Sequence, residues 1–326
     1  MTWDHPRGYA ALRAFDGGVT WDALPLEDLR ARPLRDLAAT YDLLVIEHAG
    51  LGAAIADSAL TPMNELFAPS ELSRWRTATA GRTWESHTVG GRQWALPIDA
   101  ATQVSVYRPD RVDRVPERWA DVLGAVRTVP SALCLGGPHA MLMWLSMPRD
   151  ADSLRLLRDL WPHVDQSVSR GGPIAIHDAL DAGVIAYCPL AYQFTGYSHL
   201  AWANAPDLRG VLGGRGLAVS ASTRDKDAVR AWTRAFLAPE VQRDFVPARG
   251  GQPAVAAYWK GRATARSLEQ AQIRPRHRGW VAVQDAGAEI VREAVTAGLD
   301  PDKACAELTR LLTEVGNAGN QVRGPR

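Results

Sequence analysis

The chain has 326 residues, of which 46% are hydrophobic and 22% are charged. This composition is typical of a folded protein rather than a disordered one, and the length suits two lobes of roughly 100–200 residues each. The 37 Lys and Arg residues against 36 Asp and Glu residues give a net charge of +1, so no broad field directs the chain to nucleic acid or to an anionic membrane.

The first predicted elements are strands and helices in alternation. Residues 40–50, TYDLLVIEHAG, place a short run of Leu, Val and Ile between Asp42 and a Gly-containing loop, which is typical of a buried parallel strand. Glu47 and His48 stand at the carboxyl end of this strand. The alternation predicts an α/β lobe with a parallel sheet.

Residues 90–110, GGRQWALPIDAATQVSVYRPD, predict a hairpin arm and then a strand interrupted by one carboxylate. Asp99 follows the apolar run, and Gln103 comes soon after it. One interpretation is that Asp99 caps a turn after Pro97 by accepting backbone N–H groups. The other is that Asp99 has a functional partner, because a strand this apolar does not normally end in an unpaired carboxylate. The sequence context favours the second interpretation.

A second group of α/β elements follows. The pattern predicts a helix over 115–129, a strand over 131–137 that ends in glycines, a helix over 174–183 and a strand over 184–192. Residues 214–246 then predict a strand and two helices broken at Pro239. We therefore expect a second lobe between about residues 106 and 214.

Polar and aromatic residues follow several of these strands. Open α/β sheets bind ligands beyond the carboxyl ends of their strands, where loops converge. The candidates at such positions are Trp3, His5 and Arg7, then Glu47 and His48, then His139, and then the segment from Tyr192 to Tyr197. This mixture is typical of a cleft for a small molecule. For residues 4–7, DHPR, a simple Asx-type turn is an equal alternative.

Signatures of common enzymes and metal sites are missing from the sequence. There is no GxSxG elbow, P-loop or HExxH motif, and the histidines show no helical pairing suited to zinc. The three cysteines are far apart and odd in number, which fits reduced core thiols. We expect neither a metal nor a cofactor.

The sequence also predicts where the protein resides. No stretch approaches the ~18 unbroken apolar residues of a membrane span. The start, MTWDHPRGYAALRAF, has no apolar core after a basic segment. The expected location is therefore cytoplasmic, or periplasmic if a signal peptide was removed.

Several segments in order resemble the family 1 extracellular solute-binding proteins of ABC importers. They include YDLLVIEHAG, GGRQWALPIDAATQVSVYRPD, GGRGLAVSASTRDKDAVRAWTRAFLAPEVQRDFV and RPRHRGWVAVQDAGAEIVREAV, and the likeness extends through nearly the whole chain. The resemblance implies an α/β, two-lobed fold like the type 2 periplasmic-binding-protein fold, with a hinge and an interlobe cleft. It places lobe 1 at residues 1–105 and 215–250, and lobe 2 at residues 106–214 and 251–326.

The resemblance also implies roles for single residues. In this family the stretch containing ALPID leads to the hinge, so Asp99 and Gln103 are expected to be ligand groups beside the crossing between lobes. Together with His139 from the strand pattern, the expected ligand-binding residues are Trp3, His5, Arg7, Glu47, His48, Asp99, Gln103, His139, Tyr192, Tyr197, Arg215 and Arg249. Sugar-binding relatives stack aromatic rings on the sugar and bond its hydroxyl groups with carboxylates and amides. His5, Arg7 and His48 are more cationic than a neutral sugar requires, which favours an anionic ligand.

The main prediction is a solute-binding protein that closes on a small polar, anionic organic ligand, with an ABC permease as partner if the protein is exported. The alternative is a cytoplasmic enzyme on this fold. Its candidate catalytic groups are Asp99, His5, His48 and Glu47, because His titrates near neutral pH and the pKa of a desolvated carboxyl group rises toward it. A third possibility, a ligand-sensing module that acts on a partner protein, has no protruding segment to support it.

Overall fold

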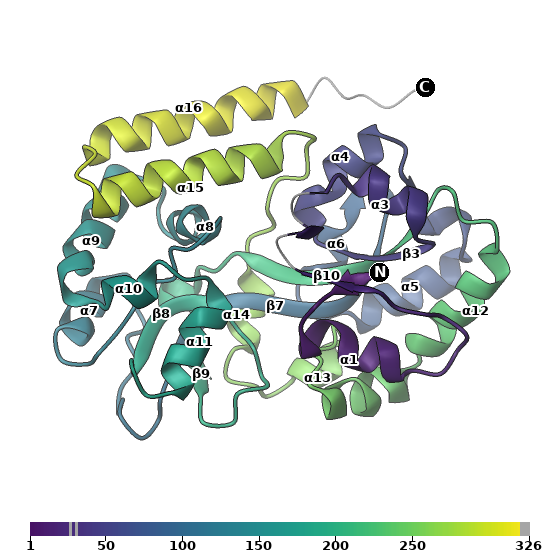
Figure 1. The fold of residues 1–326 in the computed structure, drawn as a ribbon, viewed down its shortest axis with the longest axis horizontal. Helices are drawn as coiled ribbons and strands as arrows, with labels where there is room; N and C mark the ends of the chain where they lie inside the picture. Colours follow the sequence, from purple (N-terminus) through teal and green to yellow (C-terminus); the bar gives the residue numbers. More distant parts are fainter. Residues whose placement is uncertain (26–27, 30–31, 320–326) are drawn as a thin grey trace.

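The structure is a computed structural model that describes residues 1–25, 28–29 and 32–319. Its helices and strands form two lobes, and the strands β7 (Leu96–Tyr107) and β10 (Leu212–Ser220) run side by side from one lobe to the other (Figure 1). The long helices α15 (Trp280–Thr296) and α16 (Pro301–Gly319) pack side by side on one lobe.

The remaining elements follow in chain order. Before β7 come β1 (Thr2–Trp3), α1 (Pro6–Ala14), β2 (Ala23–Leu24), α3 (Leu34–Thr40), β3 (Leu43–Ile46), η1 (His48–Gly50), α4 (Leu51–Ala56), β4 (Leu60–Thr61), η2 (Met63–Glu65), α5 (Pro69–Ala78), α6 (Thr83–Ser86), β5 (Thr88–Val89) and β6 (Arg92–Gln93). Between β7 and β10 come α7 (Trp119–Val126), α8 (His139–Leu145), α9 (Ala151–Leu160), η3 (Trp161–His163), α10 (Gln166–Ser169), α11 (Pro173–Asp181), β8 (Tyr187–Tyr192), β9 (Ala201–Ala203) and η4 (Pro206–Leu208). After β10 come α12 (Lys226–Phe236), the π-helical turn η5 (Val241–Phe245), η6 (Pro247–Arg249), α13 (Ala256–Trp259) and α14 (Ala265–Gln270).

A six-stranded sheet joins the lobes, with the path β3-β10-β7-β8 and with β4 and β9 paired to β10 and β7. All its pairs are antiparallel. The prediction of a parallel sheet around residues 40–50 was therefore wrong for this sheet, because the partner of β3 is the returning strand β10. All four residues of β3 are buried because both faces of the strand are covered, and not because its neighbours in the sheet are parallel. A parallel pair does occur between β1 and β2.

The predicted strand over 131–137 was also wrong. This segment forms only one isolated bridge, between Ser131 and Tyr187. Its backbone donors are taken by the end of α10 instead: Leu133 N donates to Ser169 Oγ at 2.9 Å and Leu135 N donates to Ser169 O at 3.1 Å. Bonds to a helix end thus replace a strand ladder.

The buried apolar residues support the division into lobes. Apart from Ala49, the largest core takes its buried members from residues 104–211 and 280–308. A second core takes its members from residues 11–98 and 217–246. The exact lobe boundaries stay a prediction, and residues 320–326 of the predicted lobe 2 lie outside the described residues.

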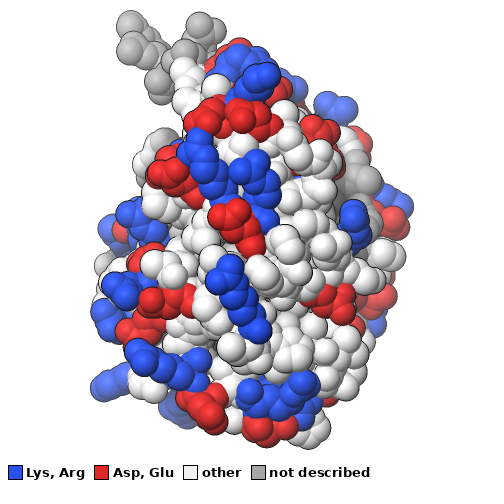
Figure 2. Space-filling view, turned by 90° about the vertical axis from the view of Figure 1, so that its left-hand side faces the viewer, with Lys and Arg blue, Asp and Glu red and all other residues white. Residues whose placement is uncertain are grey.

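The side of the molecule seen in Figure 2 carries basic and acidic side chains in close alternation. Arg155 on α9, for example, pairs with Asp152 and with Asp302 on α16. Such alternation gives this face no field of a single sign. No helix within the described part of the chain is long and apolar enough to cross a membrane.

Gly214 of β10 pairs with Ala100 of β7, and its backbone requires glycine. Its φ is +86°, and an added Cβ would stand 2.3 Å from the backbone O of Asp99. Gly250 has a similar φ of +76° but no atom within 4 Å of an added Cβ. The two positions therefore share backbone strain and differ in steric overlap.

We expect Gly214→Ala to lower the free energy of unfolding by about 1–3 kcal/mol more than Gly250→Ala, because an alanine at 214 must also push the crossing strands apart. Urea unfolding of both variants measures the difference. Equal losses in the two variants would show that the strands do not pass as closely as the structure has them.

Candidate functional site

A cleft of about 520 Å³ lies beside the crossing strands, with lining residues from both lobes. Seven of the residues expected at the ligand site line it: Trp3, Arg7, Glu47, Asp99, His139, Tyr192 and Arg215. They come from elements far apart in the sequence, among them β1, α1, β7, α8 and β10. Their role in binding stays a prediction.

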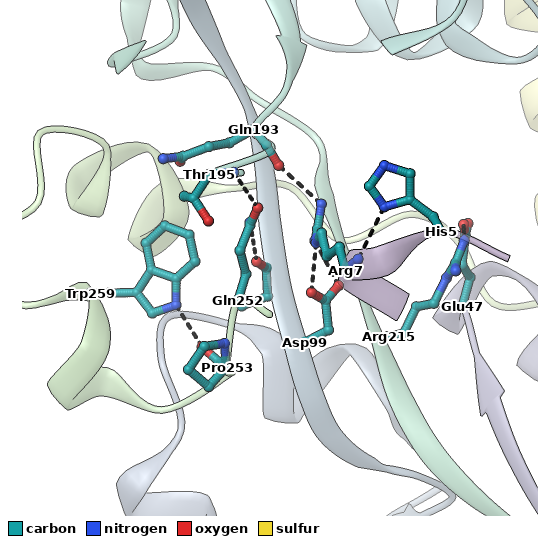
Figure 3. A network of polar contacts seen from close by, with 11 residues as sticks. His5, Arg7, Glu47, Asp99, Gln193, Thr195, Arg215, Gln252, Pro253 and Trp259 are labelled. Carbon is teal, nitrogen blue, oxygen red and sulfur yellow. Dashed lines mark hydrogen bonds and ion pairs between the residues drawn. The ribbon is translucent and has the colours of Figure 1, made fainter. Parts of the chain in front are cut away.

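Arg7 and Asp99 form a bidentate ion pair at the cleft (Figure 3). Arg7 Nε donates to Asp99 Oδ1 at 2.9 Å, and Nη2 donates to Oδ2 at 2.7 Å. Arg7 Nη1 donates to the backbone O of Gln193 at 3.0 Å, so this one side chain links α1, β7 and the segment after β8. Only 6% of the Arg7 side chain and 15% of the Asp99 side chain are exposed. The carboxylate in the apolar strand thus has a protein partner that neither sequence interpretation named.

Glu47, at the end of β3, bonds two further arginines. Arg215 Nη2 donates to Oε1 at 3.1 Å, and Arg274 Nη2 donates to Oε2 at 3.0 Å. Burial acts to raise the pKa of the Glu47 carboxyl group, but Arg274 and Arg215 outweigh it and hold this pKa well below its usual range. Glu47 is therefore a carboxylate at any ordinary pH.

The two ion-paired groups adjoin, because Arg215 stands opposite Asp99 in the β7–β10 ladder. We call the five residues Arg7, Asp99, Arg215, Glu47 and Arg274 the cleft cluster. It contains three guanidinium groups and two carboxylates, so it carries one net positive charge. Arg215 and Arg274 are 8% and 4% exposed, which makes this an excess charge in a largely desolvated place.

The aromatic residues around the cleft cluster are packed against it. Trp3 is 5% exposed. The His5 ring stacks on the Trp3 ring with the two centroids 4.9 Å apart. The Arg215 guanidinium lies 4.1 Å from the centroid of the Trp3 ring. Phe194 meets Trp3 and His5 edge-on and lies 4.8 Å from the Arg7 guanidinium. These rings hold the arginines in place. Tyr192 is the partly exposed aromatic of the lining.

The facing wall is built from the first turns of two helices. His139 begins α8, and its ring centroid lies 5.8 Å from that of Tyr192. Gly172 is the N-cap of α11 and offers no side-chain cap, and Gly172, Pro173, Ile174 and Ala175 of this first turn all line the cleft. Arg170 and Asp178 line the same wall.

Gln103 does not line the cleft. It is 2% exposed, and its Oε1 accepts bonds from Ser146 Oγ at 2.7 Å and from Val211 N at 3.0 Å. It therefore ties the end of α8 to the start of β10. Gln103 lies four residues after Asp99 on the same face of β7, but the strand has entered lobe 2 by this point, and an amide satisfied by protein partners there is a structural residue.

His48 does not line the cleft either, since it points into lobe 1. It is fully buried, and its ring meets His87 edge-on with centroids 6.0 Å apart. Within the described residues neither of its ring nitrogens has a hydrogen-bond partner. Burial holds its pKa well below the ordinary value, so His48 is a neutral core residue.

Three other expected residues do not line the cleft. The Nδ1 atom of His5 accepts from Arg7 N at 3.2 Å and so caps α1. Tyr197 OH donates to Oδ1 of the lining residue Asp178 at 2.7 Å. Arg249 bonds the backbone O of Phe245 and lies 3.5 Å over its ring, within lobe 1.

Sequence reasoning missed several lining residues: Arg170, Asp178, Phe194, Arg274 and Gln284. Phe194 lies inside the segment 192–197 that was singled out. The signal for α11 was the Gly-Gly-Pro run before it, which marks a helix start without a capping side chain. No local signal distinguishes Arg274 from its neighbours in RPRHRG, because its role depends on Glu47, which is remote in the sequence.

The arrangement suits the binding of a polar molecule better than acid–base chemistry. Glu47 and Asp99 are ion-paired, His48 lies outside the cleft, and His5 caps a helix. The four groups of the enzyme alternative are therefore not assembled around a common point. Carboxylates, guanidinium groups and uncapped N–H groups offer both acceptors and donors to a ligand.

The Arg7–Asp99 pair has a direct consequence for stability. We expect Asp99→Asn to lower the free energy of unfolding by about 3 kcal/mol, because it leaves the buried Arg7 guanidinium without a countercharge. The double variant Asp99→Asn/Arg7→Gln should lose less than the sum of the single variants. Asp110→Asn, in the exposed pair with Arg108, is the matched control and should have little effect. Unfolding midpoints of Asp99→Asn equal to those of the wild type would contradict the ion pair.

The buried histidines make the fold sensitive to acid. Burial lowers the pKa of His87 and of His177 from 6.5 to about 4, so both are neutral in the folded protein at pH values where the unfolded chain binds protons. Their contribution is fully present above about pH 6.5 and is lost as the pH falls toward 4, by up to ~1.4 kcal/mol per pH unit for each histidine. Urea unfolding at several pH values in this range gives the free energy of unfolding as a function of pH. This free energy should fall less steeply with decreasing pH in His87→Gln than in the wild type, and as steeply as in the wild type in the exposed control His163→Gln. If the free energy of unfolding depends on pH equally in the wild type and in His87→Gln, His87 is not a cause of the acid sensitivity.

Comparison with known proteins agrees with this geometry at the level of the fold. No protein-family model and no curated protein matches the sequence. The GacH receptor of Streptomyces glaucescens, solved with acarbose, is similar over 97% of this chain and 96% of its own, with a TM-score of 0.77 and 15% identity. A ribitol-bound ABC solute-binding protein of Agrobacterium radiobacter covers 91% of this chain and 90% of its own (TM-score 0.73, 15% identity). Maltose-bound MalE3 of T. maritima covers 90% of both chains (TM-score 0.72, 16% identity). This chain therefore has the two-lobed type 2 periplasmic-binding-protein fold of ABC solute-binding proteins.

Proposed function

We propose that the protein is a solute-binding protein that closes its two lobes on a small polar organic molecule bearing hydroxyl groups and an acidic group. The observation that carries the proposal is the cleft, which lies at the crossing strands and takes lining residues from both lobes. A ligand there contacts both lobes at once, so it favours the closed arrangement.

The similar solved structures support the hydroxyl groups of the proposed ligand. The similar structures were solved with acarbose, maltose and ribitol, all of them rich in hydroxyl groups. In this cleft Glu47 and Asp178 offer carboxylate acceptors, and Tyr192 offers part of an aromatic face. Hydroxyl groups both donate and accept, so they match this mixed lining.

The acidic group is supported by charge. The cleft cluster carries one net positive charge, and on the facing wall the solvent-exposed guanidinium of Arg170 is matched by the carboxylate of Asp178, so the charged lining keeps one net positive charge. The uncapped first turn of α11 adds N–H donors beside it. A carboxylate or phosphate on the ligand would offset this excess.

An enzymatic function has no comparable support, because the four groups that the alternative requires do not meet. The permease partner belongs to the proposal only for an exported form of the protein. The cytoplasmic location expected from the sequence stays a prediction.

Thermal melting and titration calorimetry test the proposal with two neutral probes, maltose and ribitol, and two acidic probes, gluconate and glucuronate. A probe present at 100 times its dissociation constant should stabilise the fold by about 2.7 kcal/mol. We expect an acidic probe to bind more tightly, and we expect Arg170→Gln to weaken it while leaving the neutral probes unchanged. Arg118→Gln, an exposed substitution on α7's N-cap, is the control.

The outcomes separate the parts of the proposal. If only the neutral probes raise the melting temperature, the protein binds a solute, but the solute does not need an acidic group. Melting curves unmoved by all four probes and by a wider set of sugar acids would contradict the proposal. Recovery of a converted probe by mass spectrometry after long incubation would favour the enzyme instead.

A further inference from the structure

A second cavity, of about 330 Å³, adjoins the cleft on the other flank of Glu47. One wall comes from lobe 1, from α3, α4 and the end of β3. The opposite wall comes from Arg274 and the first turns of α15, which packs in the larger core. Four residues, Glu47, Arg215, Arg274 and Gln284, line both spaces. The volume lies within the range of sites for small molecules.

The body of this second cavity is apolar. Leu34, Leu37, Ile46, Ala53 and Val281 are among its lining residues. Several of them, such as Leu37 and Ile46, belong to a separate small core of lobe 1 and are almost fully buried. An apolar wall of this kind favours a hydrocarbon group over a sugar ring.

The polar part of the second cavity is strongly cationic. Arg32, Arg215, Arg274 and Arg278 line it, and Glu47 is the acidic residue among the described lining. Asp57, which bonds Arg278 Nη2 at 2.9 Å, lowers the excess by one more charge. Among the described residues, two net positive charges therefore remain at this end.

The buried arginines also have unused donors. Arg215 Nη1 and Arg274 Nε are buried and have no hydrogen-bond partner within the described residues. Both side chains are more than nine-tenths buried, at 9% and 4% exposure. A buried guanidinium N–H without a partner costs free energy, and a rotation of the side chain that turns this N–H toward the cavity would let an anionic group of a ligand recover it.

We propose that the second cavity binds a small amphipathic anion, a carboxylate with an unbranched apolar body of about the length of octanoate. Its carboxylate lies at the arginines and its hydrocarbon body lies along α3 and α4. The site is distinct from the cleft of the proposed solute, since Arg32, Ala53 and Arg278 line the second cavity alone, although the two spaces share Glu47, Arg215, Arg274 and Gln284. Because the two walls belong to different lobes, the occupant also holds these lobes together at this flank.

Titration calorimetry with butanoate, hexanoate and octanoate tests the proposal, with 1-octanol and acetate as probes that lack the charge or the body. Affinity should rise about fourfold for each added CH₂ group, as burial of hydrocarbon predicts. Octanoate should bind more tightly than 1-octanol and acetate.

Variants then locate the site. Ala53→Leu fills the apolar end and should remove octanoate binding. Arg32→Gln/Arg278→Gln, at two exposed side chains, should weaken octanoate at least about fivefold and leave 1-octanol unchanged, in keeping with the loss of partly exposed charge contacts. This pair keeps the test decisive if Ala53→Leu fails to fold. Arg170→Gln, which alters only the cleft, is the matched control and should bind octanoate as the wild type does.

Two results would overturn the proposal. One is an affinity that does not depend on chain length or on charge. The other is octanoate binding that survives Ala53→Leu and the double arginine variant but is lost in Arg170→Gln, which would assign the probe to the cleft. Neither result bears on the solute proposed for the cleft, which is tested with sugar acids and polyols.

Discussion

The ion pair between Arg7 and Asp99 sets the arrangement around the cleft. A carboxylate in the middle of a buried crossing strand requires a countercharge, and the first turn of α1 supplies it. The same guanidinium reaches the backbone of Gln193, so the start of lobe 1 is bound to the segment that leaves β8. Gln252 reinforces this junction, because its Oε1 accepts from Thr195 N and its Nε2 donates to Ala100 O (Figure 3). The crossing is thus held by polar bonds in a place where both lobes meet.

The excess positive charge of the cleft cluster explains why two cavities meet at Glu47. One carboxylate is shared by Arg215 and Arg274, and each of these arginines keeps an unpartnered N–H. A group of this kind is a barrier to apolar contact between the lobes, so the space on either side of it stays open. The cleft side is polar and the α3–α4 side is apolar. The same charges therefore border a polar space on one side and an apolar space on the other.

The sequence predicted the positions of the cleft well where they depend on strand ends. Trp3, Arg7, Glu47 and Tyr192 end or closely follow strands, and all four line the cleft. It was less informative where a side chain could point either way. Gln103 lies on β7 like Asp99 but faces Ser146 inside lobe 2, and His48 directly follows Glu47 but points into lobe 1. Glu47 and His48 are neighbours and point to opposite sides, whereas Asp99 and Gln103 are four residues apart on one face of β7, which enters lobe 2 between them.

Composition and periodicity by themselves predicted an α/β protein long enough for two lobes, and the resemblance to solute-binding proteins implied the hinge and the cleft near Asp99. Composition and periodicity also determined the location of most helices, since these depend on local spacing of apolar residues. Only the tertiary structure decided the partners. The antiparallel pairing of β3 with β10, the bidentate bond from Arg7 to Asp99 and the sharing of Glu47 by Arg215 and Arg274 join residues far apart in the chain. Such contacts depend on how the whole chain closes, because charge and hydrogen bonding act across space and leave no local pattern in the sequence.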